Sequence, residues 1–146
     1  MSKLLEIALS QYGQKEITGE KDNQTIVGYA KEAGHAWVDD DETPWCSIFM
    51  DWSSMKAGVE RTHKANARSW LTVGETVNHP ETGDIVILKR GTNPNQGHVG
   101  IYINDMVPEH GPTRLIRVLG GNQGNEVKIS LYDKNDVLGY RKLRAL

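Results

Sequence analysis

The sequence predicts an α+β fold in which amino-terminal helices pack on one face of an antiparallel sheet of about five or six strands. Before Pro80, apolar residues recur at the spacing of helices, whereas after Pro80 apolar and polar residues alternate with a period of two. The helical segments come first and the strands follow, without the βαβ alternation that parallel sheets need. The strands are therefore expected to pair antiparallel, with the helices on one side.

Four helical segments are expected before Pro80, each with apolar residues on one face. A glycine, which often ends a helix, follows each of them. In the third segment, apolar residues recur along one face of the helix, which indicates that this face packs in the core. The four segments cover residues 2–12, 25–33, 44–57 and 66–71.

Five strands are expected after Pro80, because runs rich in aliphatic residues are separated there by turns rich in Gly, Asn, Pro and Asp. They cover residues 84–89, 98–103, 114–119, 127–132 and 137–142. No internal repeat interrupts this order. A chain of 146 residues fits one domain, here expected over residues 1–146, and can bury a core by packing alone.

Composition excludes several classes of function. The formal net charge is -2, so no basic surface is expected for nucleic acid or anionic lipid. No apolar run has the length of a signal peptide or of a membrane span. We therefore expect synthesis in the cytoplasm, no membrane insertion, and export by another route if the protein acts outside the cell. A monomer is the default expectation.

Cys46 is the only cysteine, which excludes an intramolecular disulfide. Thr43 can act as the N-cap of the third helix and Pro44 fits its first position, so Cys46 falls in the first turn. There the free N–H groups and the helix dipole stabilise a thiolate, which makes Cys46 a candidate nucleophile. The alternative is a small buried core residue, which is the commoner role of a free cysteine.

A thiolate nucleophile needs a base, and His98 is the candidate. Alternation along residues 97–103 places Val99 and Ile101 on the core face and His98 on the opposite face, beside Gly100. The alternative is a histidine satisfied in the core or exposed at a sheet edge. The other four histidines fall in expected loops and are interpreted as solvated surface residues.

A third polar group must orient the histidine, and Asn122 is the candidate. It follows an expected strand and lies in the run Gly120-Gly121-Asn122-Gln123-Gly124, where its carbonyl could accept an imidazole N–H. The same run is also typical of an ordinary hairpin turn.

Four segments together resemble the CHAP and NlpC-type cysteine hydrolases of bacterial cell walls, from about residue 5 to the carboxyl end. The resemblance implies a papain-like fold and a catalytic triad, carried over here onto Cys46, His98 and Asn122. One departure is that many CHAP members have Glu where this chain has Gly120. The four segments are Pro44-Trp45-Cys46-Ser47-Ile48-Phe49, Gly83-Asp84-Ile85-Val86-Ile87, Gly97-His98-Val99-Gly100-Ile101-Tyr102 and Leu119-Gly120-Gly121-Asn122-Gln123.

The resemblance implies a peptidoglycan hydrolase that cleaves an amide in or next to the stem peptide through a Cys46 thioester, without a cofactor. The segment from Gly13 to Gly19 resembles a phage- and bacterium-associated branch, which suggests a phage endolysin. Trp45 and Trp70 are candidate walls for the substrate, although packing is the alternative for both, and Gln123 is a candidate substrate contact.

Other functions stay open at this point. The same chemistry would serve a toxin or effector amidase delivered into a competing bacterium, and a non-catalytic cell-wall-binding or phage structural module belongs to a different class. A zinc enzyme is disfavoured because no two histidines have the spacing of a zinc site. The acidic run Asp39 to Glu42 could bind calcium, although a solvated loop is the preferred interpretation.

Overall fold

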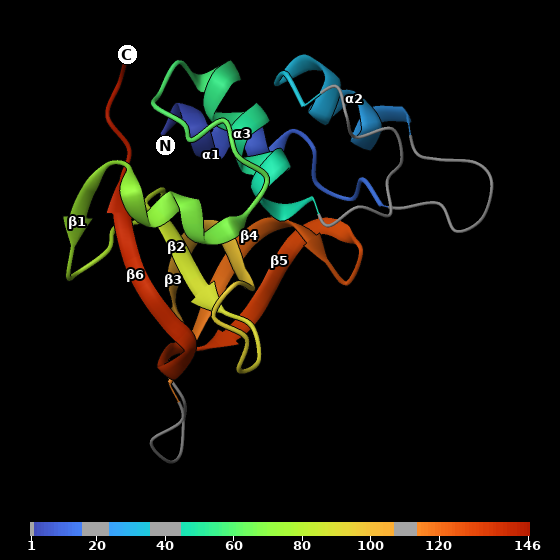
Figure 1. Ribbon diagram of the computed structural model, residues 1–146. Coiled ribbons are helices and arrows are strands. Elements are labelled where there is room, and N and C mark those ends of the chain that lie inside the picture. The colour runs from blue at the N-terminus through green and yellow to red at the C-terminus, as the bar shows by residue number, and fades with distance from the viewer. Residues whose placement is uncertain (1, 16–23, 36–44, 107–113) are drawn as a thin grey trace.

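A computed structural model of the chain describes residues 2–15, 24–35, 45–106 and 114–146, and it has the predicted α+β architecture. The three α-helices gather on one side of the sheet (Figure 1). None of the described helices has the length and apolar character of a membrane span. The helices are α1 (Lys3–Leu9), α2 (Gln24–Glu32) and α3 (Cys46–Ala57), with the short 3-10 helices η1 (Ala67–Thr72) and η2 (Lys134–Asp136).

The six described strands form one antiparallel sheet in the order β1-β6-β2-β3-β4-β5. Five of them match expected strands, but β3 runs three residues and β4 four residues beyond the expected ends, so Gly120 to Gln123, expected after the strand, belong to β4. β1 was not expected, because its three residues are too few to show alternation, and it pairs only with β6 at one edge. The strands are β1 (Glu75–Val77), β2 (Ile85–Lys89), β3 (Gly97–Met106), β4 (Leu115–Gln123), β5 (Glu126–Asp133) and β6 (Val137–Lys142).

Helix boundaries follow local capping. The Oγ of Ser2 accepts the N–H of Leu5 at 3.2 Å, so α1 begins at Lys3. α1 ends three residues before the expected boundary, and Tyr12, expected on its apolar face, is 54% exposed because it lies in the turn that follows. Gly58 ends α3 in the left-handed conformation, with φ of 72°, as its position after the apolar stripe predicted.

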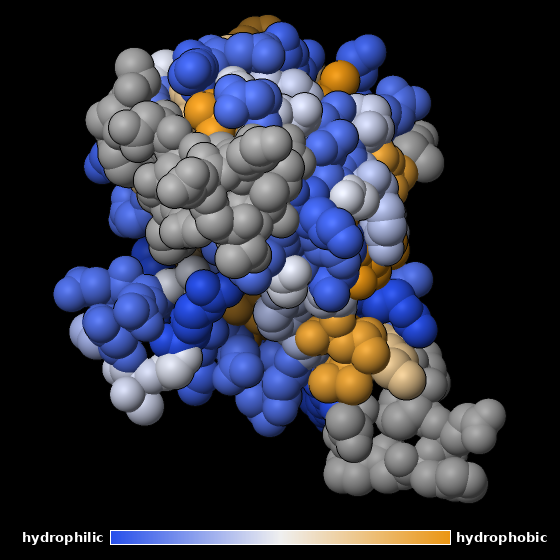
Figure 2. All heavy atoms as spheres, turned by 90° about the vertical axis from the view of Figure 1, so that its right-hand side faces the viewer, coloured by the Kyte–Doolittle hydropathy of each residue, from blue (hydrophilic) through white to orange (hydrophobic). Residues whose placement is uncertain are grey.

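Apolar side chains form a separate buried cluster on each face of the sheet. Val99 and Ile101 of β3 pack with the helices, whereas Tyr102 packs on the other face with Val118 and Tyr140. The alternation predicted along β3 is therefore confirmed. The face that carries β5 is mostly hydrophilic, with only small separate apolar patches (Figure 2).

Helix α3 is the central element of the helical layer, since it packs against α1, α2, β3 and β4. Every residue from Cys46 to Ser54 is buried. The helix approaches β4 closely at Gly121, where an added Cβ would lie only 2.6 Å from the Trp45 ring and 2.8 Å from the Cβ of Phe49. A glycine at this point lets the amino end of α3 rest directly on the backbone of the sheet.

Candidate active site

Cys46 is the first residue of α3, and Trp45 occupies the N-cap position. The predicted place in the first helical turn is therefore confirmed. The helix begins two residues later than expected, so Thr43 is not its N-cap and Pro44 is not its first residue; both residues themselves lie outside the described ranges. Cys46 is 6% exposed and lines a cavity described below.

Burial is the largest single influence on the Cys46 thiol, and it raises the pKa. Three groups oppose it: the imidazole of His98, as hydrogen-bond partner and as a positive charge, the backbone N–H of Val99, and the guanidinium of Arg90. Together they outweigh burial and hold the pKa below that of an ordinary thiol. The surroundings therefore favour a thiolate, which is the nucleophilic form of cysteine.

His98 lies near the beginning of β3, opposite Leu88 of β2, and is 2% exposed. Its Nε2 is 2.9 Å from Oε1 of Gln123. Its ring stacks on Tyr132 of β5, with the centroids 5.2 Å apart and the planes at 24°. Nδ1 is also buried and has no hydrogen bond of standard geometry within the described ranges, so it is the nitrogen left for the Cys46 thiol.

The amide of Gln123 fixes the tautomer of His98. Its Nε2 donates to the carbonyl oxygens of Val118, at 3.0 Å, and Lys128, at 2.5 Å. With both N–H groups used, the amide can only present Oε1 to His98, so the imidazole must donate from Nε2. In neutral His98 the lone pair is then on Nδ1, where it can take the thiol proton.

The group that contacts His98 is thus Gln123, and the candidate named from the sequence was its neighbour Asn122. Regular alternation along β4 would put Asn122 on the same face as Gly120, and Gln123 on the helix side. However, the pairing of β4 with β5 shifts register between Gly120 and Gln123, and Asn122 has φ of 57°. This irregularity turns Gln123 toward His98 instead.

Gly120 makes room for this contact. A Cβ at this position would lie 2.9 Å from Oε1 of Gln123 and 3.3 Å from Nε2 of His98. The residue that departs from the common CHAP pattern therefore sits beside the histidine, and its missing side chain leaves space for the Gln123 amide.

Three candidate substrate contacts must be corrected, because none of their side chains is accessible. Trp45 is 1% exposed and packs near Tyr29 and Phe49. Trp70 is 0% exposed and donates from Nε1 to the Oγ of Ser47 at 2.8 Å. Both are core residues. Gln123 is also buried, and its amide is used within the protein.

The interpretation of His35 as a solvated residue was wrong. His35 is buried, and its Nε2 lies 2.9 Å from Oδ2 of Asp51, a fully buried carboxylate of α3. The same Oδ2 accepts from Arg61 at 3.1 Å, and Oδ1 accepts the backbone N–H of His63. The Asp51 carboxylate thus ties α3 to the end of α2 and to the segment that follows α3.

Of the remaining histidines, His63 and His79 are exposed, as predicted, and His110 lies outside the described residues. Within the described ranges no group of three or more His, Cys, Asp or Glu side chains could hold a metal ion. The acidic run from Asp39 to Glu42 lies outside these ranges, so calcium binding there stays an open alternative.

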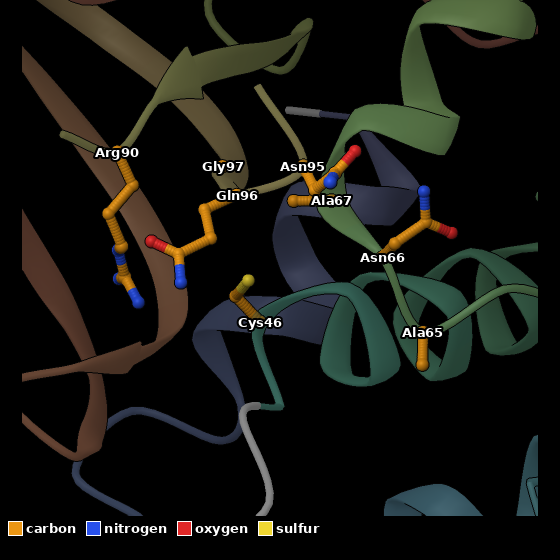
Figure 3. A pocket seen from close by; sticks show the side chains of 8 residues that line it. All are labelled: Cys46, Ala65, Asn66, Ala67, Arg90, Asn95, Gln96 and Gly97. Carbon is orange, nitrogen blue, oxygen red and sulfur yellow. The ribbon is translucent and has the colours of Figure 1, made fainter. Parts of the chain in front are cut away.

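A cavity of about 200 Å³ opens next to Cys46. In Figure 3, Arg90 and Gln96 lie on one side of the thiol and Asn66 lies on the other. Sequence reasoning missed these residues because they lie in loops, where no periodicity marks a shared site. The lining consists of Cys46, Ala65, Asn66, Ala67, Arg90, Asn95, Gln96 and Gly97.

Tyr132 is a further residue of the site that was missed. Burial raises its pKa to about 12, with the Arg90 charge opposing and the Cys46 thiolate adding to the rise. The phenol beside the imidazole therefore stays protonated and neutral at physiological pH. The alternating pattern of β5 predicted the strand but gave no sign that Tyr132 lies against His98.

The lowered pKa of Cys46 predicts fast alkylation by iodoacetamide below pH 8.5, roughly the pKa of a free thiol. The rate should fall as the pH drops through the lowered pKa and the thiolate is protonated. In His98→Ala the profile should move to higher pH, because burial then has less opposition. The measurement is the alkylation rate against pH, by intact mass. His79→Ala, in an exposed loop, should leave the profile unchanged. An unchanged profile in His98→Ala would contradict the influence of His98 on the pKa of Cys46.

The sequence model of the CHAP domain family matches residues 38–122 of the chain. Among solved structures, the fold is similar to that of a protein described as similar to lipoprotein, NLP/P60 family, from Staphylococcus aureus subsp. aureus Mu50, with a TM-score of 0.52 and 17% identity. That alignment covers 96% of this chain and 40% of the other, so this chain spans less than half of that protein. A comparison with curated protein sequences finds no significant match.

Proposed function

Because this chain belongs to the CHAP domain family, we propose that it is a cysteine-dependent peptidoglycan hydrolase that cleaves an amide bond in or next to the stem peptide. The family match supports a peptidoglycan hydrolase-type function. The catalytic part of the proposal rests on the buried arrangement of Cys46, His98 and Gln123. The Gln123 amide binds Nε2 of His98, so Nδ1 stays available to the Cys46 thiol.

In the proposed first half-reaction, Nδ1 of His98 takes the proton of the Cys46 thiol and the sulfur attacks the scissile carbonyl carbon. The backbone N–H of Cys46, at the first helical position where no intrahelical acceptor exists, donates to the developing oxyanion. The protonated His98 then gives its proton to the departing amine, and a thioester remains on Cys46.

In the second half-reaction a water molecule gives a proton to His98 and attacks the thioester carbonyl. The tetrahedral intermediate collapses, the carboxylic acid product leaves, and the proton returns from His98 to the Cys46 sulfur. Throughout, Gln123 acts as a positioning residue, because it holds the ring through Nε2 and takes no proton. We propose it for the role that the sequence assigned to Asn122.

For the biological role, we propose a phage endolysin that reaches the host wall after release or delivery by another system. The segment from Gly13 to Gly19, which resembles a phage- and bacterium-associated branch, supports this role. Genes for phage holins and tail proteins beside the coding sequence would agree with it. A gene for an immunity protein in that place would favour the delivered effector amidase instead.

The test is digestion of purified, defined peptidoglycan, with mass spectrometry of the released muropeptides. The parent protein should release fragments that carry one new amine and one new carboxylic acid, and the masses identify the bond. Cys46→Ala, which removes only the sulfur nucleophile, should release none. Equal release by Cys46→Ala would rule out the thioester mechanism, and wall binding without release by the parent would favour a non-catalytic module.

A further inference from the structure

We propose that Arg90 forms a carboxylate-binding subsite beside Cys46, so that the scissile amide lies next to a free carboxylate of the substrate. This inference rests on the proposed function and narrows its substrate class. Stem peptides carry side-chain and terminal carboxylates, and a subsite of this kind would select among their amide bonds.

The position of Arg90 is the first argument. It directly follows the last residue of β2, and its side chain lines the cavity that contains the Cys46 thiol (Figure 3). Its guanidinium is close enough to lower the pKa of both Cys46 and Tyr132. A ligand group held by Arg90 would therefore lie within one or two residues of the bond that the thiolate attacks.

The charge of Arg90 is the second argument. The side chain is exposed, and it makes no ion pair or hydrogen bond with any described residue. Arg61 and Arg68, in contrast, donate to oxygens of the chain at 2.7 to 3.1 Å. The other polar groups around the cavity are neutral amides, and no acidic side chain lines it within the described ranges. The Cys46 thiolate is then the one anionic group among the described residues that line the cavity, so the exposed guanidinium can also pair with a ligand, and its planar fork matches a carboxylate.

The wall that carries the subsite is held in place before a ligand arrives. Nε of Arg68 donates to the carbonyl oxygen of Gln96 at 2.7 Å, which fastens the loop after Arg90 to η1. Gly97 allows this approach, since a Cβ there would lie 3.2 Å from the Cγ of Arg68. At the other end of the loop, Leu88 of β2 is buried. A preformed wall keeps the ordering cost of binding low.

The sharpest test compares two alkylating reagents of similar shape, iodoacetate and iodoacetamide, which differ in one negative charge. Cys46 is the only cysteine, so the intact mass reports its labelling alone. Any effect of Arg90 on the thiolate changes both rates by the same factor and cancels in their ratio. Arg90→Gln should lower the ratio of the iodoacetate rate to the iodoacetamide rate by about fivefold or more.

The matched control is Lys89→Gln, which removes the same charge one residue away. Lys89 is outside the cavity lining and its Nζ lies 3.9 Å from the Asp136 carboxylate, so the ratio should stay at the parent value. If Arg90→Gln slows both reagents equally, Arg90 acts only on the thiolate and the subsite proposal is overturned. An equal fall of the ratio in both variants would also overturn it, since general surface charge would then explain the effect.

Substrate selectivity gives the second readout. The parent should cleave stem peptides with free carboxylates faster than the same peptides converted to carboxamides, and Arg90→Gln should raise KM for the carboxylate form only. Equal or faster cleavage of the carboxamide form by the parent would overturn the subsite. If the parent cleaves neither form but the labelling ratio depends on Arg90, the subsite stands and the proposed hydrolase function fails.

Discussion

Replacing His98 by alanine should slow peptidoglycan cleavage by about 100-fold to 10,000-fold, the usual contribution of a general acid–base group. His98 serves in both half-reactions, and Cys46 loses its hydrogen-bond partner with it. The measurement is the rate of new amine release from purified walls. Circular dichroism should show a folded variant, and His79→Ala, in an exposed loop, should keep the parent rate. A His98→Ala variant that releases amine at the parent rate would eliminate the mechanism.

Variants of Gln123 and of its neighbour Asn122 test which amide orients His98. Gln123→Met keeps a side chain of similar length but removes the acceptor for His98, which should cost about 5-fold to 150-fold in rate, equivalent to about 1–3 kcal/mol for an unmatched buried group. Asn122→Ala should change the rate far less, because the group that holds Nε2 is the Gln123 amide. If Asn122→Ala is the more damaging of the two, Asn122 and not Gln123 orients the imidazole.

Much of this candidate site could be predicted from the sequence because its two proposed catalytic residues lie in regular elements. Cys46 begins a helix with a clear apolar stripe, and His98 lies in a strand with clean alternation. Each pattern fixes which way its residues face, and the order of helices and strands fixes the fold class. The family resemblance then joined the two residues, which lie far apart in the sequence.

The other residues of the site could not be predicted, because they lie where the alternation of a strand is interrupted or in loops, which have no periodic pattern. The register shift between Gly120 and Gln123 brings the Gln123 amide to His98, and the run of glycines did not tell which of the two neighbouring amides would make this contact. Arg90 and Gln96 lie in a loop, so only the folded chain brings them to Cys46. His35 lies just past a helix end, where exposure is the usual expectation, yet its partner Asp51 is in the core.

The fold would support the proposed catalysis, because both proposed catalytic residues are buried in elements that are held on several sides. α3 is enclosed by two helices and the sheet, and β3 is an inner strand with neighbours on both sides. Burial alone would suppress the thiolate, so the site depends on donors fixed around the sulfur before substrate binds. The stability of α3 is therefore a condition for the proposed nucleophile, and Asp51 ties this helix to His35, Arg61 and the backbone N–H of His63.

Replacing Asp51 by alanine should lower the free energy of unfolding by about 3–5 kcal/mol, the usual cost of removing one partner from a buried ionic group. The Asp51 carboxylate is fully buried and accepts from His35, Arg61 and the backbone N–H of His63. Without it, a buried imidazole and a largely buried guanidinium lose their shared acceptor. Urea unfolding followed by tryptophan fluorescence measures the change.

Two further variants separate this buried cluster from an ordinary surface pair. Asp51→Asn keeps one acceptor oxygen and should lose less stability than Asp51→Ala. Asp136→Ala breaks the half-exposed pair with Lys89, which at 3.9 Å should contribute no more than about 1 kcal/mol. If Asp51→Ala unfolds at the same urea concentration as Asp136→Ala, the cluster does not anchor α3. If Asp51→Ala is the least stable variant, as expected, then a residue five positions after Cys46 on the same helix stabilises the helix that carries the proposed nucleophile.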